Sequence, residues 1–135
     1  MPLINNFKRK SPLDLNKSIT IGTALPINEV NFFKGTETMA EQNKTNLINL
    51  LLTDPFERIN LPNYGVGIKH LLFEQNLDEN LLQEKIYQQT ARYIPSIKVV
   101  HVKTGLSKDK HTLHLNVIYK SLLDNSLDNI QLNFN

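Results

Sequence analysis

The stretch NLINLLLTDPFERINLPNYGVGIKHLLFEQ, residues 46–75, carries the strongest structural signals of this chain. It opens as the apolar end of a helix predicted over residues 37–53, for which Thr36 can serve as the N-cap. The last two turns are apolar nearly all round, so this helix should be buried on several sides. Asp54-Pro55 ends it, because the residue before a proline avoids helical angles and proline lacks a backbone N–H.

The rest of this stretch is predicted to form a structured loop and a short helix. Residues 56–67 combine the charged pair Glu57-Arg58 with a proline and two glycines, a composition typical of a loop. The Arg58 guanidinium has two compatible roles there: it can latch the loop by hydrogen bonds to the backbone, or it can contact a partner. A short helix is predicted over residues 68–73.

Another helix is predicted over residues 77–93. Asn76 followed by Glu79 forms a capping-box signature, apolar residues recur at helical spacing, and Pro95 ends the pattern. The residues expected in the core are Leu47, Leu51, Leu72, Phe73, Leu82 and Ile86.

Beyond Pro95 the apolar period changes to that of strands. Residues 97–102 form one extended run, residues 113–119 alternate cleanly, and the polar connection 104–110 suits an antiparallel hairpin. A third alternation, residues 130–134, predicts a short strand at the edge of the sheet. This edge either completes the domain's own sheet or pairs with a strand of another protein, with residues 120–129 as a hinge.

The first 35 residues contain three prolines and two glycines and show little amphipathic period. This pattern predicts an extended N-terminal arm, residues 1–35, with one short strand near residues 18–21. Residues 36–135 are predicted to form a single α+β domain, in which two main helices pack on a small, mainly antiparallel sheet.

Composition excludes several classes of protein. With 135 residues, 40% of them hydrophobic, the chain suits one domain with a modest core. It has no cysteine, which excludes disulfides and thiol chemistry. The formal charge of +2 is too small for a dedicated nucleic-acid clamp. No apolar run is long enough for a membrane span, and no secretory signal opens the sequence, so we expect neither nucleic-acid nor membrane partners.

The histidines do not predict a metal site. His111 and His114 lie three apart on a predicted strand and point to opposite faces, so His101 can share a face with only one of them. His70 lies far away on a helix, whereas a zinc site needs three or four converging ligands.

No catalytic pattern stands out either. The candidate carboxylates for a glycosidase are Glu57, Glu74, Asp78, Glu79 and Glu84. Most lie at helix starts or at exposed helical positions, where capping already explains them. Nucleophile, phosphate-loop and zinc-protease motifs are absent, so we expect no catalytic residue, no metal and no cofactor.

The motifs of residues 46–75 resemble those of the small baseplate wedge protein of contractile-tailed phages, the lysozyme-like tail wedge family. In that family a helix ending in LLLT is followed by a glycine, by E-R, by a P-x-F-G turn and by L-L-F-E. The corresponding positions here are 50–53, 57–58, 62–65 and 71–74. The resemblance begins upstream with IGTALPI, residues 21–27, and covers nearly everything after about residue 18.

Two departures from the family pattern concern its contacts. The glycine expected before E-R is Phe56, and the E-P-R triplet expected after the last long helix reads Ile94-Pro95-Ser96. In the family this triplet helps to dock the protein on the helical core bundle of neighbouring wedge subunits. Ile94 could replace a salt bridge by apolar packing, with a matching change in the partner.

The resemblance implies a structural protein of the virion tail baseplate, assembled in the host cytoplasm, with the fold of the sheath protein's inner domain. It implies docking on other wedge proteins and templating of the first sheath ring by strand exchange. The expected wedge contacts are Glu57, Arg58, Pro62, Tyr64, Gly65, Tyr93, Ile94, Pro95 and Ser96. The expected sheath contacts are Leu113, Leu115, Val117, Tyr119, Ile130, Leu132 and Phe134.

Two other functions stay open at this point. One is a peptidoglycan hydrolase, as the family's lysozyme-like name suggests. The other is a small nucleic-acid-binding module that uses Lys103, Lys108 and Lys110 on the hairpin. Related proteins also serve type VI secretion baseplates, so the resemblance does not separate a phage tail from another injection machine.

Overall fold

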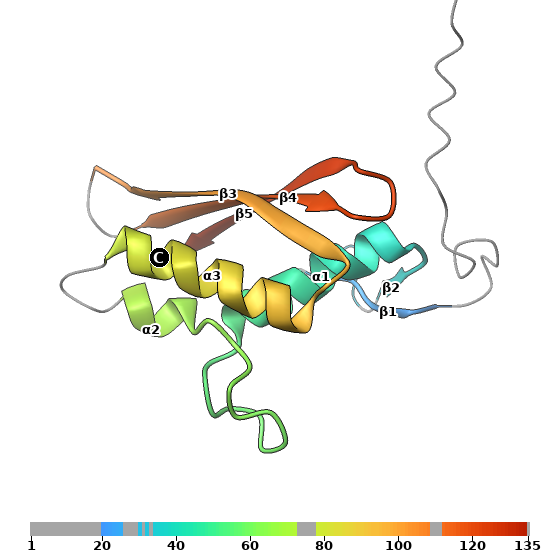
Figure 1. Ribbon diagram of the computed structural model, residues 1–135, viewed down its shortest axis with the longest axis horizontal. Helices are drawn as coiled ribbons and strands as arrows, with labels where there is room; N and C mark the ends of the chain where they lie inside the picture. The colour runs from blue at the N-terminus through green and yellow to red at the C-terminus, as the bar shows by residue number, and fades with distance from the viewer. Residues whose placement is uncertain are drawn as a thin grey trace, which may run out of the picture.

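The computed structural model describes residues 20–25, 30, 32, 34–72, 78–108 and 112–134. In chain order the elements are β1 (Gly22–Thr23), β2 (Gly35–Thr36), α1 (Met39–Leu52), α2 (Ile68–Leu72), α3 (Glu79–Tyr93), β3 (Ile97–Leu106), β4 (Leu113–Ser121) and β5 (Leu127–Phe134). The helices lie on one side of the β3-β4-β5 sheet, and the loop between α1 and α2 projects away from these layers (Figure 1). The predicted α+β class with antiparallel sheets is confirmed.

Helix α1 begins two residues later than predicted. Its N-cap is Thr38, whose side-chain oxygen accepts a hydrogen bond of 3.2 Å from the Glu41 backbone N–H. Thr36, the predicted cap, is instead buried in β2, where it pairs with Gly22 of β1. Extended pairing of this backbone excludes the helical start that local sequence favoured. Thr53 closes the other end by donating its backbone N–H to the Asn49 carbonyl.

Helix α3 also has a different cap from the one predicted. The Asp78 carboxylate accepts hydrogen bonds from the backbone N–H groups of Asn80 and Leu81. The predicted cap, Asn76, lies outside the described residues. Leu82 and Ile86 are buried as predicted, whereas Leu81 is 62% exposed, because it lies off the apolar face.

The main sheet has the strand order β3-β4-β5, and both pairings are antiparallel. The hairpin is confirmed, but β3 runs through residue 106 into the segment predicted as a loop, paired there with β4. A register irregularity between Val99 and His101 lets Val99 and Val102, three positions apart, both face the core. The edge position of the last strand is confirmed within the described part of the sheet.

The predicted hinge over residues 120–129 is wrong. Lys120 pairs directly with Leu127, so only a tight turn, residues 122–126, separates β4 from β5. Asn125 takes a positive φ of 55° there, a conformation that asparagine tolerates. Hydrogen bonds from Ser126 lower the pKa of Asp124, which stabilises the same turn.

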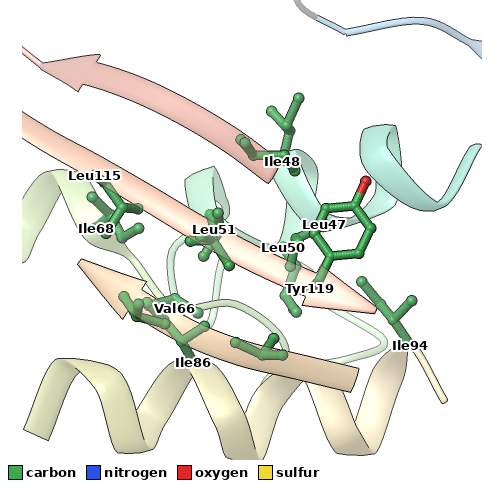
Figure 2. Close-up of a cluster of buried hydrophobic side chains, with 14 of the residues drawn as sticks. Leu47, Ile48, Leu50, Leu51, Val66, Ile68, Ile86, Ile94, Leu115 and Tyr119 are labelled. Carbon is green, nitrogen blue, oxygen red and sulfur yellow. The ribbon is translucent and has the colours of Figure 1, made fainter. Parts of the chain in front are cut away.

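One apolar core lies between the helices and the sheet (Figure 2). Its fully buried side chains include Leu47, Leu50, Leu51, Val66, Ile68, Ile86, Val102, Leu115 and Val117. Four predicted core residues, Leu47, Leu51, Leu82 and Ile86, are confirmed. Of the other two, Phe73 lies outside the described residues and the side chain of Leu72 is not described.

The N-terminal region contributes the β1-β2 ribbon. A short strand is expected near residues 18–21; the observed strand β1 begins directly after that segment, at Gly22, while residues 1–19 lie outside the described part of the chain. The ribbon is tied to α1, because the Leu25 N–H donates to the Thr45 hydroxyl oxygen at 3.3 Å. In the part of the chain that is described, no helix is long and apolar enough to cross a membrane.

Candidate protein interface

The loop 54–66, between α1 and α2, is stabilised by hydrogen bonds among its own residues. The Glu57 carboxylate accepts a 2.9 Å hydrogen bond from the Asp54 N–H, and the Glu57 N–H donates back to the Asp54 carbonyl at 3.1 Å. Farther along, the Phe56 N–H donates to the Pro62 carbonyl at 2.9 Å. The charged side chain of Glu57 therefore stabilises the turn at the start of the loop.

The end of the loop is anchored on α1. The Val66 N–H donates to the Leu50 carbonyl and the Gly67 N–H to the Thr53 carbonyl, each at 3.0 Å. Gly65 has a φ of 115° and lies against the Thr53 carbonyl, where a Cβ atom would collide with backbone. Only glycine fits such a position without strain.

A row of four side chains joins the loop to the C-terminal end of α3. The Arg58 guanidinium lies 4.2 Å from the centroid of the Tyr64 ring. Tyr64 in turn meets the edge of Tyr93, with ring centroids 5.0 Å apart. Arg92 lies 5.3 Å from the Tyr93 ring on the same helix. We call this set, Arg58, Tyr64, Tyr93 and Arg92, the arginine-tyrosine row.

Both arginines of the row are exposed, whereas Tyr64 is only 8% exposed. Burial raises the pKa of the Tyr64 hydroxyl, and the Arg58 charge opposes part of that rise. The ring stays neutral at ordinary pH, which suits a cation–π contact. Among the described residues, neither guanidinium has a carboxylate within 4.0 Å; the Asp54 carboxylate instead lies 3.2 Å from His70 Nε2.

Gln89 of α3 supports the same surface, and the sequence analysis missed it. Its side-chain oxygen accepts from the Gly65 N–H at 3.1 Å, and its nitrogen donates to the Asn63 carbonyl at 2.9 Å. A glutamine on a helix carries no local signal for such a role. The only signal in the sequence was indirect: the N–H and C=O groups of the loop backbone need hydrogen-bond partners.

The loop also presents apolar side chains to solvent. Phe56 is 78% exposed, Ile59 is 96% exposed and Leu61 is 43% exposed. Phe56 has a φ of 69°, a left-handed conformation that is costly for a bulky residue. Phenylalanine at this position therefore adopts a backbone conformation that glycine takes without strain, and it adds an exposed ring.

The segment after α3 divides between core and surface. Ile94 is 5% exposed and belongs to the core, so its side chain is not available to a partner while the domain is folded. The Ser96 hydroxyl donates to the Asn43 side chain at 2.8 Å, inside the chain. Pro95 is exposed. Of the expected Ile94-Pro95-Ser96 contact, Pro95 has the side chain best placed to meet another protein.

The residues expected to contact sheath mostly face the core. Leu113, Leu115, Val117, Tyr119 and Ile130 are each less than 5% exposed. The first four lie on β4, which is paired on both sides. The surface that remains for pairing with another strand is the outer edge of β5, where Leu132 and Phe134 are half-buried.

Cross-strand side-chain contacts hold β5 in register. The Tyr119 hydroxyl donates to the Asp128 carboxylate at 3.1 Å, and His114 Nδ1 lies 2.7 Å from the Asn133 side-chain oxygen. Burial, together with the Asp128 charge, raises the pKa of Tyr119.

The candidate carboxylates do not converge on a site. Glu57 binds the loop backbone, Asp78 caps α3, and Glu84 accepts from Gln88 at 3.1 Å. Glu79 lies exposed in the first turn of α3, and Glu74 is outside the described residues. Within the described residues, no group of three or more His, Cys, Asp or Glu could hold a metal ion. Lys103 and Lys108 are exposed, while His111 and Lys110 are not described.

The family is decided by a sequence profile that matches residues 37–126, from the N-terminus of α1 to the turn before β5. The chain belongs to the baseplate wedge protein gp25 family. The match includes the loop, the arginine-tyrosine row and the β3-β4 hairpin. Family membership makes the chain a structural component of a tail baseplate.

Solved structures share the fold of this family member. A crystal structure of a candidate tail lysozyme from Geobacter sulfurreducens has a TM-score of 0.64 and 18% sequence identity, and the alignment covers 75% of this chain and 94% of that one. A chain of the anti-feeding prophage baseplate, determined by cryo-EM, has a TM-score of 0.51 and 22% identity, with coverage of 83% and 82%. A search of curated proteins finds no match.

Proposed function

We propose that the chain docks on neighbouring wedge proteins through the loop 54–66 and the end of α3, and that the outer edge of β5 templates the first ring of the tail sheath. Assembly would take place in the host cytoplasm, and the chain would act without catalysis. The division into an arm, residues 1–35, and a wedge domain, residues 36–135, is part of the same proposal.

The observation that carries the sheath proposal is the outer edge of β5, with which no strand among the described residues pairs. Sheet edges offer backbone donors and acceptors that another strand can use. The Ser121 N–H donates to the Ser126 carbonyl, and the register is unbroken from Leu127 to Phe134. In an antiparallel ladder, alternate residues bond to the neighbouring strand. The N–H groups of Gln131 and Asn133 therefore point to the free edge, whereas the Asn129 N–H donates to the Asp128 carboxylate at 2.8 Å.

Docking on wedge proteins draws support from the way the structure joins two expected contact segments. Tyr64 of the loop and Tyr93 of α3 are in contact, and Gln89 bonds to the loop backbone. Glu57, Arg58 and Pro62 are exposed beside them. A rigid surface of this kind loses little conformational entropy on binding.

The sheath proposal is tested by Gln131→Pro in particles assembled with the variant chain. Proline is tolerated on an edge strand where its missing N–H faces outward, so the domain should fold while the edge is blocked. We expect complete baseplates with bare tail tubes, seen by electron microscopy. Gln131→Ala, the matched control, should give normal sheathed tails. Sheathed tails with Gln131→Pro would refute strand addition at β5.

A coarser experiment removes the last strand by truncation after Asn125. Bare tubes on complete baseplates would agree with the sheath proposal, and normal sheath would refute it. Because Ile130 is a core residue, circular dichroism of the truncated chain must accompany this experiment. A truncated chain that unfolds leaves Gln131→Pro as the deciding variant.

A peptidoglycan hydrolase is the second candidate, because one structural neighbour is described as a candidate tail lysozyme. Two carboxyl groups across a cleft are needed for that chemistry. In this chain the carboxylates of Glu57 and Asp78 are used in a turn and a cap. Turnover of purified cell wall that disappears when one carboxylate is changed to its amide would support the hydrolase and refute the proposal of a non-catalytic protein.

A further inference from the structure

The loop 54–66 combines a strained backbone with exposed apolar side chains, and its Arg58 is linked through two tyrosine rings to Arg92 of α3. Residues in rare backbone conformations persist where the surrounding structure holds them, and they gather at binding sites. Phe56 has a φ of 69° yet is 78% exposed, so packing within the described chain does not account for its ring. Glycine would remove the strain at this position.

The loop is rigid enough to present these side chains in one arrangement. Hydrogen bonds join Phe56 to Pro62, Asp54 to Glu57, and Leu61 to Arg58 within the loop. Gln89 and Tyr93 hold its base against α3. The backbone of the loop projects from the layered body (Figure 1), and its apolar side chains Phe56, Ile59 and Leu61 are exposed. A projecting apolar tip is complementary to a concave apolar pocket.

Arg58 lies in this loop, and the arginine-tyrosine row joins it through Tyr64 and Tyr93 to Arg92 at the end of α3. Arg58 and Arg92 are exposed, lie over tyrosine rings, and have no carboxylate partner among the described residues. A guanidinium held in place pairs in two-pronged fashion with a carboxylate. The partner that fits therefore places aspartate or glutamate side chains around an apolar pocket.

We propose that the loop 54–66 inserts Phe56 and Ile59 into an apolar pocket of another baseplate protein, and that acidic side chains at the rim of this pocket pair with Arg58 and Arg92. This inference rests on the docking role proposed above and adds the chemistry of the partner surface. Phe56 is then a binding residue retained at a cost to the stability of the free chain.

The first test is Phe56→Gly, which separates stability from binding. Glycine relieves the left-handed strain, so the unfolding midpoint of the purified chain should stay equal or rise. Loss of a buried ring should lower incorporation into baseplates by about tenfold or more. Val100→Ser on β3, 52% exposed and far from the loop in sequence, is the matched control and should change neither quantity.

A sharp fall in the midpoint with Phe56→Gly would overturn the proposal, because the ring would then support the fold. Normal incorporation into baseplates of a double variant, Phe56→Gly with Ile59→Ser, would overturn the proposal as well.

The second test maps the partner surface directly. Benzoylphenylalanine at position 56 is irradiated in assembled particles, and the cross-linked peptide is sequenced by mass spectrometry. We expect a peptide of another baseplate protein that contains apolar residues with aspartate or glutamate nearby. Arg58→Glu should then reduce incorporation, and a lysine at the identified acid should restore it. A peptide without acidic residues nearby, or no restoration, would refute the acidic rim.

The two proposals fail in different ways. If the unaltered chain is absent from purified baseplates, the docking role itself is wrong. If the unaltered chain is incorporated and the loop variants are incorporated equally well, docking uses another surface and only the inference about the loop is wrong.

Discussion

The ring of Tyr64 meets the ring of Tyr93 edge to face, at 71° between their planes and 5.0 Å between their centroids. This contact joins a loop to a helix end 29 positions further along the sequence (93 − 64 = 29). It places Arg58 and Arg92 at the two ends of one row of side chains. Two segments that are separate in sequence become one candidate docking surface.

The Tyr64–Tyr93 contact should be measurable by a double-mutant cycle. Aromatic pairs of this geometry contribute about 0.5–1.5 kcal/mol beyond the area they bury. We expect Tyr64→Leu and Tyr93→Leu to be coupled by that amount in urea unfolding. The pair Tyr64 and Tyr87, the latter also on α3, supplies the control cycle. Equal coupling in both cycles would show that the effect is not specific to the ring contact.

Leu51 on α1 is fully buried, so Leu51→Ala should lower the free energy of unfolding by about 2–5 kcal/mol. Leu81→Ala on α3 is the control, because this leucine is 62% exposed and should change stability by less than about 0.5 kcal/mol. Denaturant titration measures both. A loss below about 1 kcal/mol for Leu51→Ala would contradict the burial of this face of α1 in the core.

Lys98 of β3 and Lys120 of β4 are directly opposite in the sheet register. Like charges in this position are destabilising, and opposite charges contribute about 0.2–1 kcal/mol. Lys98→Glu should therefore raise the free energy of unfolding by about this amount, with a smaller gain at high salt. Lys103→Glu, opposite Asn116, is the control. An equal gain from both variants would assign the effect to net charge and not to the pair.

Tyr119 should make the protein sensitive to alkali. Burial raises its pKa in the folded state above the ordinary value of 10.0, so the folded chain holds this proton more tightly than the unfolded chain. The contribution of the protonated Tyr119 to the free energy of unfolding is fully present below pH 10 and is lost as the pH rises towards the folded-state pKa. Tyr119→Phe removes the titrating group and should flatten the fall in stability above pH 10, followed by urea unfolding at several pH values.

The Tyr119→Phe variant also loses the hydrogen bond to Asp128. We therefore expect lower stability at neutral pH, by about 1 kcal/mol, alongside the flatter alkaline profile. Tyr87→Phe is the control. It removes the hydroxyl of a half-buried tyrosine, which donates to the Val100 carbonyl at 3.3 Å. An unchanged alkaline profile in Tyr119→Phe would assign the sensitivity to other groups.

The elements with strong period were predictable, because each rests on local spacing. The apolar residues of α1 and α3 recur at helical intervals. In β4, buried apolar residues alternate with more exposed residues. Asp54-Pro55 after α1 and Pro95 after α3 mark the ends by the geometry of proline, which no tertiary contact can change. Family membership was predictable from the same stretch, since its motifs stand in order along the chain.

The first residues of the helices and the structure of residues 120–129 were less predictable. Thr36 and Thr38 are both acceptable caps by residue type, and pairing of Thr36 with Gly22 decides between them. Residues 120–129 are mostly polar, yet residues 120–121 and 127–129 form strand because neighbouring backbone supplies their hydrogen bonds. Polarity alone does not distinguish a hinge from the outer face of an edge strand.

The candidate docking surface shows the same division. The sequence predicted that Glu57-Arg58 and residues 93–96 matter, but Gln89 and the exposure of Phe56 and Ile59 appeared only in three dimensions. Ile94 and the inward-facing residues of β4 lie in the core. The sequence could not show this, because an apolar residue gives the same pattern whether it packs in its own domain or against a partner.

By itself the sequence determined the helices, the strand order along the chain, the family and the positions where proline and glycine constrain the backbone, because these depend on residues close to one another. The tertiary structure alone decided which caps are used, which apolar side chains remain exposed, and which edge of the sheet is free. Those outcomes depend on contacts between segments far apart in the chain, such as Tyr64 with Tyr93, and local spacing does not encode them.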